Sequence, residues 1–541
     1  MLANLPILSF ITFSPLLGVL VLLFMPKRHV RWIKSIAIAA TLIPLLLAGW
    51  LYADFDYTAD GMQYEETVQW INVPILNDAI PETTLVSYQF NYNMSVDGLS
   101  LAMVFLTALI CTMAALASAH IKKRWKAFYI LFLLLEMGIF GVFLSGDLFQ
   151  FFMFFEITLV PMFFLIGIWG YTDREKAANK FLIYNGLGSA VMLIAFLILV
   201  NTAGLSVEAV GDQVRAVYSG NLQVIYDNLM NPESLVNTLS EAANGGTNQF
   251  YLSETFRWVL FLMLLVAFGI KLPIFPFHTW MLKVHTEAPP SVVMIHSGIL
   301  LKMGAYGFIK FGVLLFPEQA KAGALLLAVL GVINIIYGAV LAFRQKEFKL
   351  VLAYSSISHM GIVMLGIAAF NQIGFSGAVF QMVSHGLISA LMFLIVGSLY
   401  ERTGTTMIHE LGGLAKTAPF ISGILLITGM ASLGLPGLSG FVGELLAFLG
   451  LFEARPIVTM IGMLGIILAA VYVLRAVLRI TFGPMPEQWS TMKDARFIEA
   501  LPMIALVAFI FLLGLYPSVL SEPLQHTVDL MIKNMALKVG G

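Results

Sequence analysis

The sequence predicts an all-α polytopic membrane protein with about 14 transmembrane helices. Three observations predict this class. Of 541 residues, 59% are hydrophobic and only 11% are charged, the mean hydropathy is +0.89, and apolar runs recur along the whole chain. Soluble domains contain about a quarter charged residues, so a cytosolic enzyme, a nucleic-acid-binding protein and a disordered scaffold are excluded. The net charge of −1 implies no polyanionic partner.

Each membrane-spanning helix requires about 20 mostly apolar residues. The first run has no clear cleavage site, so we expect a retained helix and not a signal peptide. The fourth and fifth runs are separated only by Gly146 and Asp147, which predict a tight turn at the membrane surface. The predicted helices are 7–25, 33–51, 98–118, 127–146, 148–169, 179–202, 256–280, 292–316, 321–343, 350–370, 373–399, 419–450, 456–480 and 499–519.

The orientation of these helices follows from the distribution of Lys and Arg, which favour cytoplasmic loops. Basic clusters follow the first, third and ninth helices. The loop 52–96 has seven acidic residues and no Lys or Arg, and the loop 203–255 is long and acidic too. We therefore predict that both acidic loops and both termini face outward in a multi-pass cell inner or plasma membrane.

Four ionisable residues inside the predicted helices are candidates for function: Glu156, Lys271, Lys302 and Glu444. A charge at the centre of a lone helix costs about 2.5–3.5 kcal/mol on insertion scales. At the usual helical rise, Glu156 lies about 12 Å and Lys271 roughly 22 Å from the start of its helix. Any one of them could be a snorkelling side chain or a structural ion pair, but two acids and two lysines at mid-depth favour a proton relay. A buried lysine between carboxylates can gain or lose a proton as its partner moves.

Histidines add to this candidate relay, because an imidazole titrates near neutrality and can both donate and accept a proton. His359 and His385 lie deep in their apolar runs and are assigned to the relay. His278 and His296 are explained equally well as histidines hydrogen-bonded between helices. No carboxylate and third ligand follow at a zinc-like interval, so a metal site is disfavoured. The single cysteine, Cys111, excludes an internal disulfide and a Cys-ligated cluster.

Two predicted helices contain breaks. Pro273 and Pro276 follow Lys271 in the seventh helix, and Pro436 and Gly437 precede Glu444 in the twelfth. Proline removes a helical hydrogen bond, and such a backbone is tolerated at membrane depth only where it lines protein or water. Each break falls in the fourth helix of a group of five, helices 4–8 and 9–13, and the two groups run in opposite orientations. Inverted repeats with broken helices are typical of transporters, whereas two unrelated proline kinks are the alternative.

This pattern divides the chain into four expected segments. Residues 1–126 form three N-terminal helices with the acidic external loop. Residues 127–316 and 317–482 form the first and second five-helix repeats, and residues 483–541 form helix 14 and a tail.

Several motifs give a specific family resemblance over roughly residues 98–485. The chain resembles the antiporter-like subunits of respiratory complex I, the NADH–quinone oxidoreductase, and within them the M-type members. The motifs are Phe155-Glu156 with Val160-Pro161 and Trp169-Gly170, Lys271-Leu-Pro, His278-Thr-Trp280, His285-Thr-Glu-Ala-Pro289, Gly298-Ile-Leu-Leu-Lys302-Met-Gly-Ala-Tyr-Gly307, Ala353-Tyr-Ser-Ser-Ile-Ser-His359-Met-Gly361 and Gly434-Leu-Pro-Gly-Leu-Ser-Gly-Phe-Val-Gly-Glu444.

The resemblance implies roles for these residues. Glu156 and Lys271 would be a charge pair whose approach or separation drives proton movement. Lys302 would be the central relay, Glu444 the exit-side or next-subunit acid, and His359 and His385 the lining of the connecting polar axis. The sequence departs from the family pattern at Trp280-Met-Leu282, at Pro290-Ser-Val-Val293, at His296 and at Glu136, and the roles of Glu136, His278, His285 and His296 stay open.

The expected function is therefore proton translocation by a membrane-arm subunit that couples quinone reduction to pumping. No Gly-x-Gly-x-x-Gly fingerprint follows a strand, so the chain itself is expected to bind no cofactor. The resemblance implies that NADH, FMN, iron–sulfur clusters and quinone belong to partner subunits, and that neighbouring antiporter-like subunits and lipid are the contacts of this chain. A subunit of a multi-subunit Na⁺/H⁺ antiporter is the alternative. The electron donor, the quinone, the stoichiometry and the choice between H⁺ and Na⁺ are not determined by the sequence.

Overall fold

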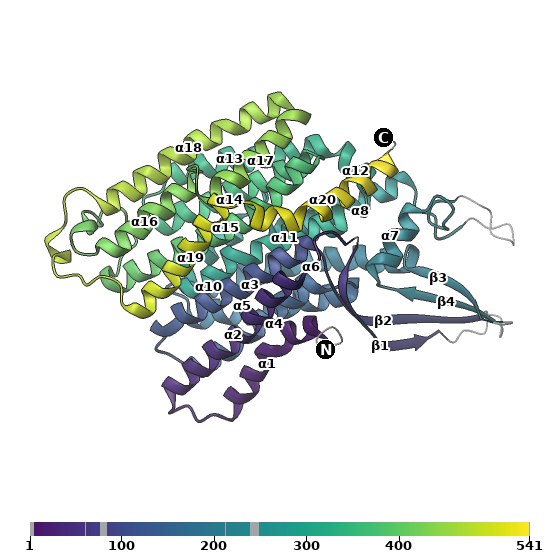
Figure 1. Cartoon of the computed structure of the whole chain (residues 1–541), viewed down its shortest axis with the longest axis horizontal. Helices are drawn as coiled ribbons and strands as arrows, with labels where there is room; N and C mark the ends of the chain where they lie inside the picture. Colours follow the sequence, from purple (N-terminus) through teal and green to yellow (C-terminus); the bar gives the residue numbers. More distant parts are fainter. Residues whose placement is uncertain (1–4, 60, 76–83, 211–212, 239–247, 540–541) are drawn as a thin grey trace.

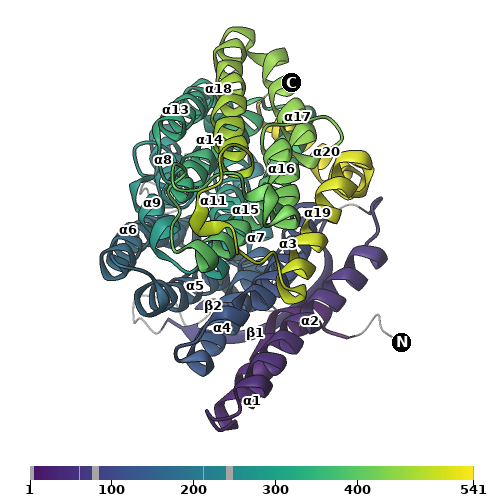
Figure 2. The ribbon, with the colours of Figure 1, turned by 90° about the vertical axis from the view of Figure 1, so that its left-hand side faces the viewer.

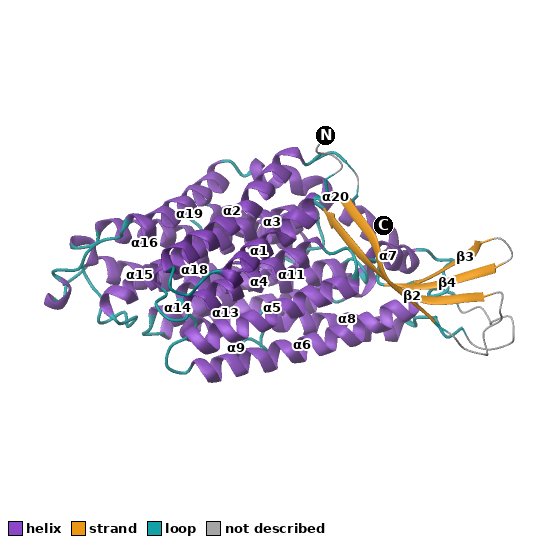
Figure 3. Cartoon of the chain, turned by 90° about the horizontal axis from the view of Figure 1, so that it is seen from below, coloured by secondary structure: helices purple, strands orange, loops and turns teal. Residues whose placement is uncertain are grey.

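The computed structural model describes residues 5–59, 61–75, 84–210, 213–238 and 248–539. They form an elongated bundle of helices with a small β-sheet at one end (Figures 1 and 3). The prediction of a mostly helical membrane protein is confirmed: within these residues, twelve helices are long and apolar enough to cross a membrane. They are α1 Ile7–Phe24, α2 Val30–Asp54, α3 Gly98–Ala117, α4 Trp125–Leu144, α5 Leu148–Trp169, α6 Arg174–Thr202, the composite helix Pro290–Val313, α13 Ala324–Arg344, α14 Phe348–Ala368, α15 Gln372–Thr403, α18 Pro456–Thr481 and α19 Phe497–Leu515.

The predicted seventh and twelfth helices are each divided into two shorter helices. The first pair is α8 (Glu254–Lys271) and α9 (Thr279–Glu287), and the second is α16 (Pro419–Ser432) and α17 (Ser439–Ala454). The non-helical residues between them contain the prolines that predicted the breaks, because proline cannot donate the hydrogen bond that would continue the helix.

One side chain satisfies the backbone that the first break leaves free. The amide of Asn334 on α13 donates to the carbonyl of Pro273 over 3.2 Å and accepts from the backbone N–H of Phe275 over 2.8 Å. The indole of Trp280 donates to the carbonyl of Ile270 over 3.0 Å. These bonds allow an irregular backbone to persist inside the bundle, where unpaired polar groups would be costly.

The composite helix Pro290–Val313 is entirely buried, and it contains two π-helical turns. Its parts are α10 Pro290–Ile295, the π-helical turn η3 His296–Leu300, α11 Leu301–Gly307 and the π-helical turn η4 Phe308–Val313. Seen along the bundle, α11 and α15 lie near its centre (Figure 2). π-Helical turns are rare and frequent at functional sites.

The expectation of an all-α chain needs a correction, because the two acidic loops contain a four-stranded sheet. Its strands are β1 Gln63–Pro74, β2 Thr84–Val96, β3 Leu205–Val210 and β4 Gln213–Ser219, in the order β1-β2-β4-β3. The β2–β4 pair is parallel and the other two pairs are antiparallel. In β2 an apolar residue stands at every second position from Val86 to Val96, which is the period of a strand. Asp60 and Asp78, two acids of the first loop, lie outside the described residues.

The predicted C-terminal tail is also structured. After α19 the chain forms α20 (Ser518–Val539), which packs on α3, α12 and α15. Its buried side chains recur at every third or fourth residue, as expected for an amphipathic helix on a bundle surface. They are Leu520, Leu524, Val528, Met531 and Met535. The remaining short helices are α7 Leu222–Met230 and α12 Pro317–Ala322, with 3₁₀ turns at Ser118–His120, Leu414–Lys416 and Glu487–Trp489.

Close packing of α15 on α17 gives a testable stability prediction. A Cβ at Gly377 would lie 2.3 Å from the backbone nitrogen of Ala447, so Gly377→Ala must push the two helices apart. Overpacking of this kind typically costs about 1–3 kcal/mol. We expect Gly377→Ala to lower the thermal midpoint of the purified protein. The control Gly423→Ala on α16 has open space within 4 Å and should leave the midpoint unchanged or raise it, since alanine favours helix. Equal midpoints for the two variants would contradict the close approach.

Candidate functional site

The six predicted relay residues occupy the central helices and the two breaks. Glu156 is on α5, Lys271 ends α8, and Lys302 is on α11. His359 is on α14, His385 on α15 and Glu444 on α17. Side-chain contacts join the last four into one connected group, and two histidines whose roles the sequence left open lie between this group and Lys271.

Lys271 is buried at the end of α8, where α8 breaks. Its ammonium has no hydrogen-bond partner among the described residues. It lies 4.9 Å from the ring centroid of Phe155 and 5.5 Å from that of Phe181, which stabilises it by cation–π attraction. Glu156 is the acid whose charge acts on it, and Oε1 of Glu156 also lacks a hydrogen bond within the described residues. The predicted pair is therefore close enough to interact but is not closed by a hydrogen bond.

His285 and His296 form a hydrogen-bonded pair that the sequence did not predict. Nε2 of His285 lies 2.9 Å from Nδ1 of His296, and the two rings are nearly perpendicular. Both side chains are fully buried. The charges of Lys271 and Lys302 both act on His296, so the pair lies between the two lysines. His296 is the first residue of the π-helical turn His296–Leu300, and its ring faces His285 on α9.

Lys302 is fully buried and is held by two contacts. Its ammonium donates to the carbonyl of Ser297 over 2.5 Å and lies 2.7 Å from Nδ1 of His385. Because an ammonium has no lone pair, His385 must present an unprotonated Nδ1 when Lys302 is charged. The contact couples the protonation of the lysine to the tautomer of the histidine.

The group continues from His385 to Glu444. The rings of His385 and His359 are 5.3 Å apart. Nδ1 of His359 lies 3.1 Å from the amide nitrogen of Gln381 and 3.5 Å from Oε1 of Glu444. Gln381 was not identified from the sequence, because a glutamine on an apolar helix face gives no distinct signal. The carboxylate of Glu444 is at the far end of this group.

Two further residues with open roles lie apart from these contacts. Glu136 on α4 is fully buried, and neither carboxylate oxygen has a hydrogen-bond partner among the described residues. His278 lies in the first break and its Nε2 is 3.0 Å from the hydroxyl of Tyr337. Nothing in the described part of the chain connects either one to Lys271 or Lys302 by a hydrogen bond.

A buried ion pair was missed by the sequence reasoning. Asp97 and Lys310 are 6% and 3% exposed and their charged groups are in direct contact. Asp97 directly precedes α3 and caps it by accepting from the backbone N–H of Ser100 over 2.8 Å. The sequence placed Asp97 just outside a helix and Lys310 near the end of one, where charged residues are ordinary.

A polar cavity of about 540 Å³ opens at the end of the bundle opposite the sheet. Its lining includes Lys180, Lys283, Glu287, Glu347 and Lys349. The Lys349 ammonium lies 3.9 Å from the ring centroid of Tyr171 and donates to the carbonyl of Thr286, the neighbour of His285, over 3.2 Å. The cavity therefore touches α9, the helix that carries His285 of the pair.

The described residues gather no three His, Cys, Asp or Glu side chains into a group that could hold a metal ion. The histidines instead contact lysines, an amide, a carboxylate and each other. Such an arrangement can pass protons between neighbouring nitrogen and oxygen atoms, directly where they are in contact and through water where they are not.

The sequence is similar to a known family over most of its length. Residues 145–469 match the family described as NADH:quinone oxidoreductase/Mrp antiporter, transmembrane. The NADH-quinone oxidoreductase subunit M of Rhodobacter capsulatus is 34% identical, over 99% of this chain and 98% of that protein. An NAD(P)H-quinone oxidoreductase chain 4 of Synechococcus elongatus is 37% identical, over 96% of this chain and 90% of that protein.

Solved structures give the same result for the fold. A chain of respiratory complex I from Thermus thermophilus with bound NADH aligns with a TM-score of 0.79 and 28% identity, over 99% of this chain and 100% of that chain. A chain of the Mrp complex from Dietzia sp. aligns with a TM-score of 0.75 and 20% identity, over 98% of each chain. The second likeness concerns the fold alone.

Proposed function

The chain belongs to the NADH:quinone oxidoreductase/Mrp antiporter transmembrane family, and from this premise we propose that it is a proton-translocating membrane-arm subunit of an NADH–quinone oxidoreductase complex. The observation that carries the proposal is the series of buried groups from Glu156 and Lys271, through the pair His285–His296, to Lys302, His385, His359 and Glu444. A buried series of proton donors and acceptors at membrane depth is costly, so its presence marks a site whose function needs these groups.

We propose that Glu156 and Lys271 act as the switch of this relay. When Glu156 is charged and close, it stabilises the ammonium of Lys271. When its charge is neutralised or moves away, desolvation favours loss of the proton from Lys271. The neighbouring histidine pair can then carry the change to Lys302, because each imidazole accepts at one nitrogen and donates at the other.

Lys302 is the central relay in this proposal, and Glu444 is its far acid. When a proton reaches Lys302, it converts the amine to an ammonium that contacts a carbonyl and a histidine. Within the described residues no carboxylate contacts this ammonium. This charge is easily lost again, so Lys302 can pass its proton to His385. His359 and Glu444 continue the series, and a buried acid beside a histidine can take up and release that proton.

We also propose an orientation of the chain in the membrane. The basic loops and the 540 Å³ cavity face the cytoplasm, and the sheet, α20 and both chain termini face outward. Proton entry then occurs through the cavity at α9. Residues 127–316 and 317–482 are the two inverted five-helix units, each with its broken helix at the relay.

The chain acts as a non-redox subunit of a translocase, and NADH, FMN, iron–sulfur clusters and quinone bind to partner subunits. The alternative is a subunit of a Na⁺/H⁺ antiporter of the Mrp type, because the matched family contains both kinds of protein. The identity of 34–37% with oxidoreductase subunits over nearly the full chain supports the first assignment.

Purification of the native assembly through a tag on this chain would distinguish the two functions. We expect the tagged chain to elute with redox subunits, and reconstituted vesicles to become acidic inside or outside only while quinone is being reduced. An assembly that lacks redox subunits and exchanges Na⁺ for H⁺ in the absence of an electron donor would establish the antiporter instead.

A further inference from the structure

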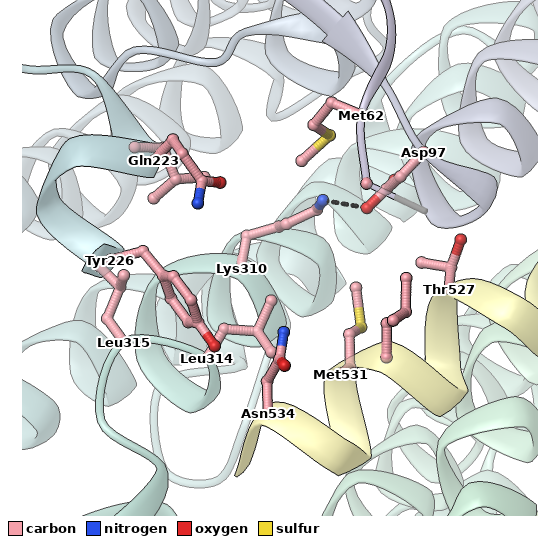
Figure 4. Close-up of a pocket in the computed structure, with 13 residues that line it drawn as sticks. Met62, Asp97, Gln223, Tyr226, Lys310, Leu314, Leu315, Thr527, Met531 and Asn534 are labelled. Carbon is pink, nitrogen blue, oxygen red and sulfur yellow. Dashed lines mark hydrogen bonds and ion pairs between the residues drawn. The ribbon is translucent and has the colours of Figure 1, made fainter. Parts of the chain in front are cut away.

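A second cavity lies at the sheet end of the bundle and contains the buried ion pair. Its volume is about 150 Å³, and α7, the end of the composite helix and α20 surround it. Figure 4 shows the Lys310 ammonium extending across this space to the carboxylate of Asp97, with Gln223 and Tyr226 to the left, Thr527 to the right and Asn534 below, near Tyr226. The relay described above uses neither charge of the pair.

Hydrogen bonds lead from this pair back toward the relay. The hydroxyl of Ser100 lies 2.8 Å from the hydroxyl of Tyr306, and the carboxylate of Asp97 accepts from both the backbone N–H and the side-chain hydroxyl of the same serine. Tyr306 is 3% exposed and also donates to the carbonyl of Phe143 over 3.0 Å. Tyr306 and Lys302 lie four residues apart on α11, so they share one face of the helix about 6 Å apart along its axis.

We infer that Tyr306, Ser100 and the Asp97–Lys310 pair form an outward branch of the proton pathway, which leaves the relay at Lys302 and ends in the 150 Å³ cavity. This inference rests on the proposed function, because it requires that Lys302 carry protons. The ion pair is the outer gate of the branch, and the cavity is the place of release.

Each proton step in this branch conserves atoms and charge. The Lys302 ammonium gives a proton, through a water in the space of one helical turn, to the Tyr306 oxygen, and Tyr306 gives its own proton to the Ser100 oxygen. Ser100 then gives its hydroxyl proton to the Asp97 carboxylate. Asp97 releases a proton to water in the cavity, and the two hydroxyls recover their starting orientation by rotation.

The Asp97–Lys310 contact favours outward release. Burial alone would raise the pKa of Asp97, but the Lys310 ammonium and the backbone N–H of Ser100 hold that pKa below its ordinary value. A proton that reaches Asp97 leaves Lys310 without its counter-charge, and the unpaired ammonium repels the proton into the cavity. The same ammonium opposes the entry of external cations.

α20 closes the branch on its outer side. The hydroxyl of Thr527 accepts from the backbone N–H of Gly98 over 3.0 Å, beside the Asp97 cap. A Cβ at Gly98 would lie 2.0 Å from the carbonyl oxygen of Pro523, so α20 packs directly on the start of α3. Protons therefore leave through the polar lining of the cavity and not along α3.

The test compares three variants in vesicles that contain the assembled complex, and it measures protons moved per quinone reduced. Tyr306→Phe removes one hydroxyl of the branch and keeps the ring. Tyr129→Phe is the matched control, because Tyr129 is also fully buried but its hydroxyl has no hydrogen-bond partner among the described residues. Lys302→Arg reports on the proposed function itself.

We expect Tyr306→Phe to lower the proton-to-quinone ratio as far as Lys302→Arg does, and Tyr129→Phe to keep the unmodified ratio. An unchanged ratio in Tyr306→Phe, with a lowered ratio in Lys302→Arg, would overturn the branch and leave the proposed function intact. An unchanged ratio in Lys302→Arg would overturn the proposed function.

A second measurement probes the cavity without changing the branch. Gln223 on α7 lines the cavity, whereas Glu233, just after α7, is exposed outside the cavity. The natural cysteine, Cys111, is fully buried and should not react. A membrane-impermeant thiol reagent added at the outer face should modify Gln223→Cys and Glu233→Cys, and only the first modification should lower the ratio. Equal ratios in the two modified proteins would show that the cavity is not an outlet.

Discussion

Replacing Lys302 by arginine is expected to abolish redox-coupled proton translocation through this chain while the complex stays assembled. Arginine keeps the positive charge but does not release its proton at accessible pH. The ammonium of Lys302 is fully buried between the Ser297 carbonyl and His385, so the relay passes through its protonation and deprotonation. Loss of a group that must both take and give a proton typically slows a step by about 10²–10⁴-fold.

The measurement is proton movement by vesicles during quinone reduction, with the amount of assembled complex determined for each sample. Lys176→Arg is the matched control, because its ammonium is exposed, pairs with Asp173 and lies outside the lining of both cavities. We expect that control to pump normally. Lys302→Gln, which is smaller than arginine, separates loss of the titratable group from steric misfit. Normal pumping by Lys302→Arg alone would reduce this lysine to a structural cation, and normal pumping by Lys302→Gln as well would show that its charge is not needed.

Neutralising Glu156 should cause a loss of similar size. Glu156→Gln keeps the shape of the side chain but removes the charge that acts on Lys271. Among the residues that the structure describes, the Lys271 ammonium then has only the Phe155 and Phe181 rings to replace this charge, and a cation–π contact is worth about 0.5–2 kcal/mol. The ammonium of Lys271 is then less stable throughout the transport cycle, and its protonation no longer responds to Glu156.

A pair of variants distinguishes a switch from two separate effects. If Glu156 and Lys271 act as one unit, Glu156→Gln combined with Lys271→Met should pump no worse than either single variant, because residues that act together are not additive. Glu175→Gln, an exposed acid at the start of α6, should pump normally. Fully additive losses in the combined variant would show that the two residues act independently.

The features that the sequence indicates most clearly are those whose energetic cost is local. Lys271 and Glu444 are conspicuous because a charge stands in an apolar run, and Pro273 and Pro436 break a helix through their own chemistry. The structure places the breaks at these prolines. It also brings Lys302, His385, His359 and Glu444 into one group, although their roles stay a prediction.

The features that were missed depend on how distant segments meet. The histidine pair requires α9 to fold back against the π-helical turn at His296, and Asp97 meets Lys310 across 213 positions of the chain. Neither pairing has a local signal. The sheet is different, because the alternation in β2 was visible in the sequence. Hydropathy alone does not reveal it, because a strand of alternating apolar and polar residues is not a continuous apolar run.

The way Lys271 is held has a consequence for the timing of the cycle. No directional bond among the described residues must break before its ammonium moves, since aromatic faces attract a cation over a broad area. Freely turning side chains change rotamer within about picoseconds to nanoseconds, whereas enzymes turn over about 1–1,000 times per second. Even a strongly slowed lysine re-equilibrates many times in each turnover. The position of Lys271 therefore follows its surroundings without delay, and the direction of transport has to be imposed by a slower event elsewhere in the assembly.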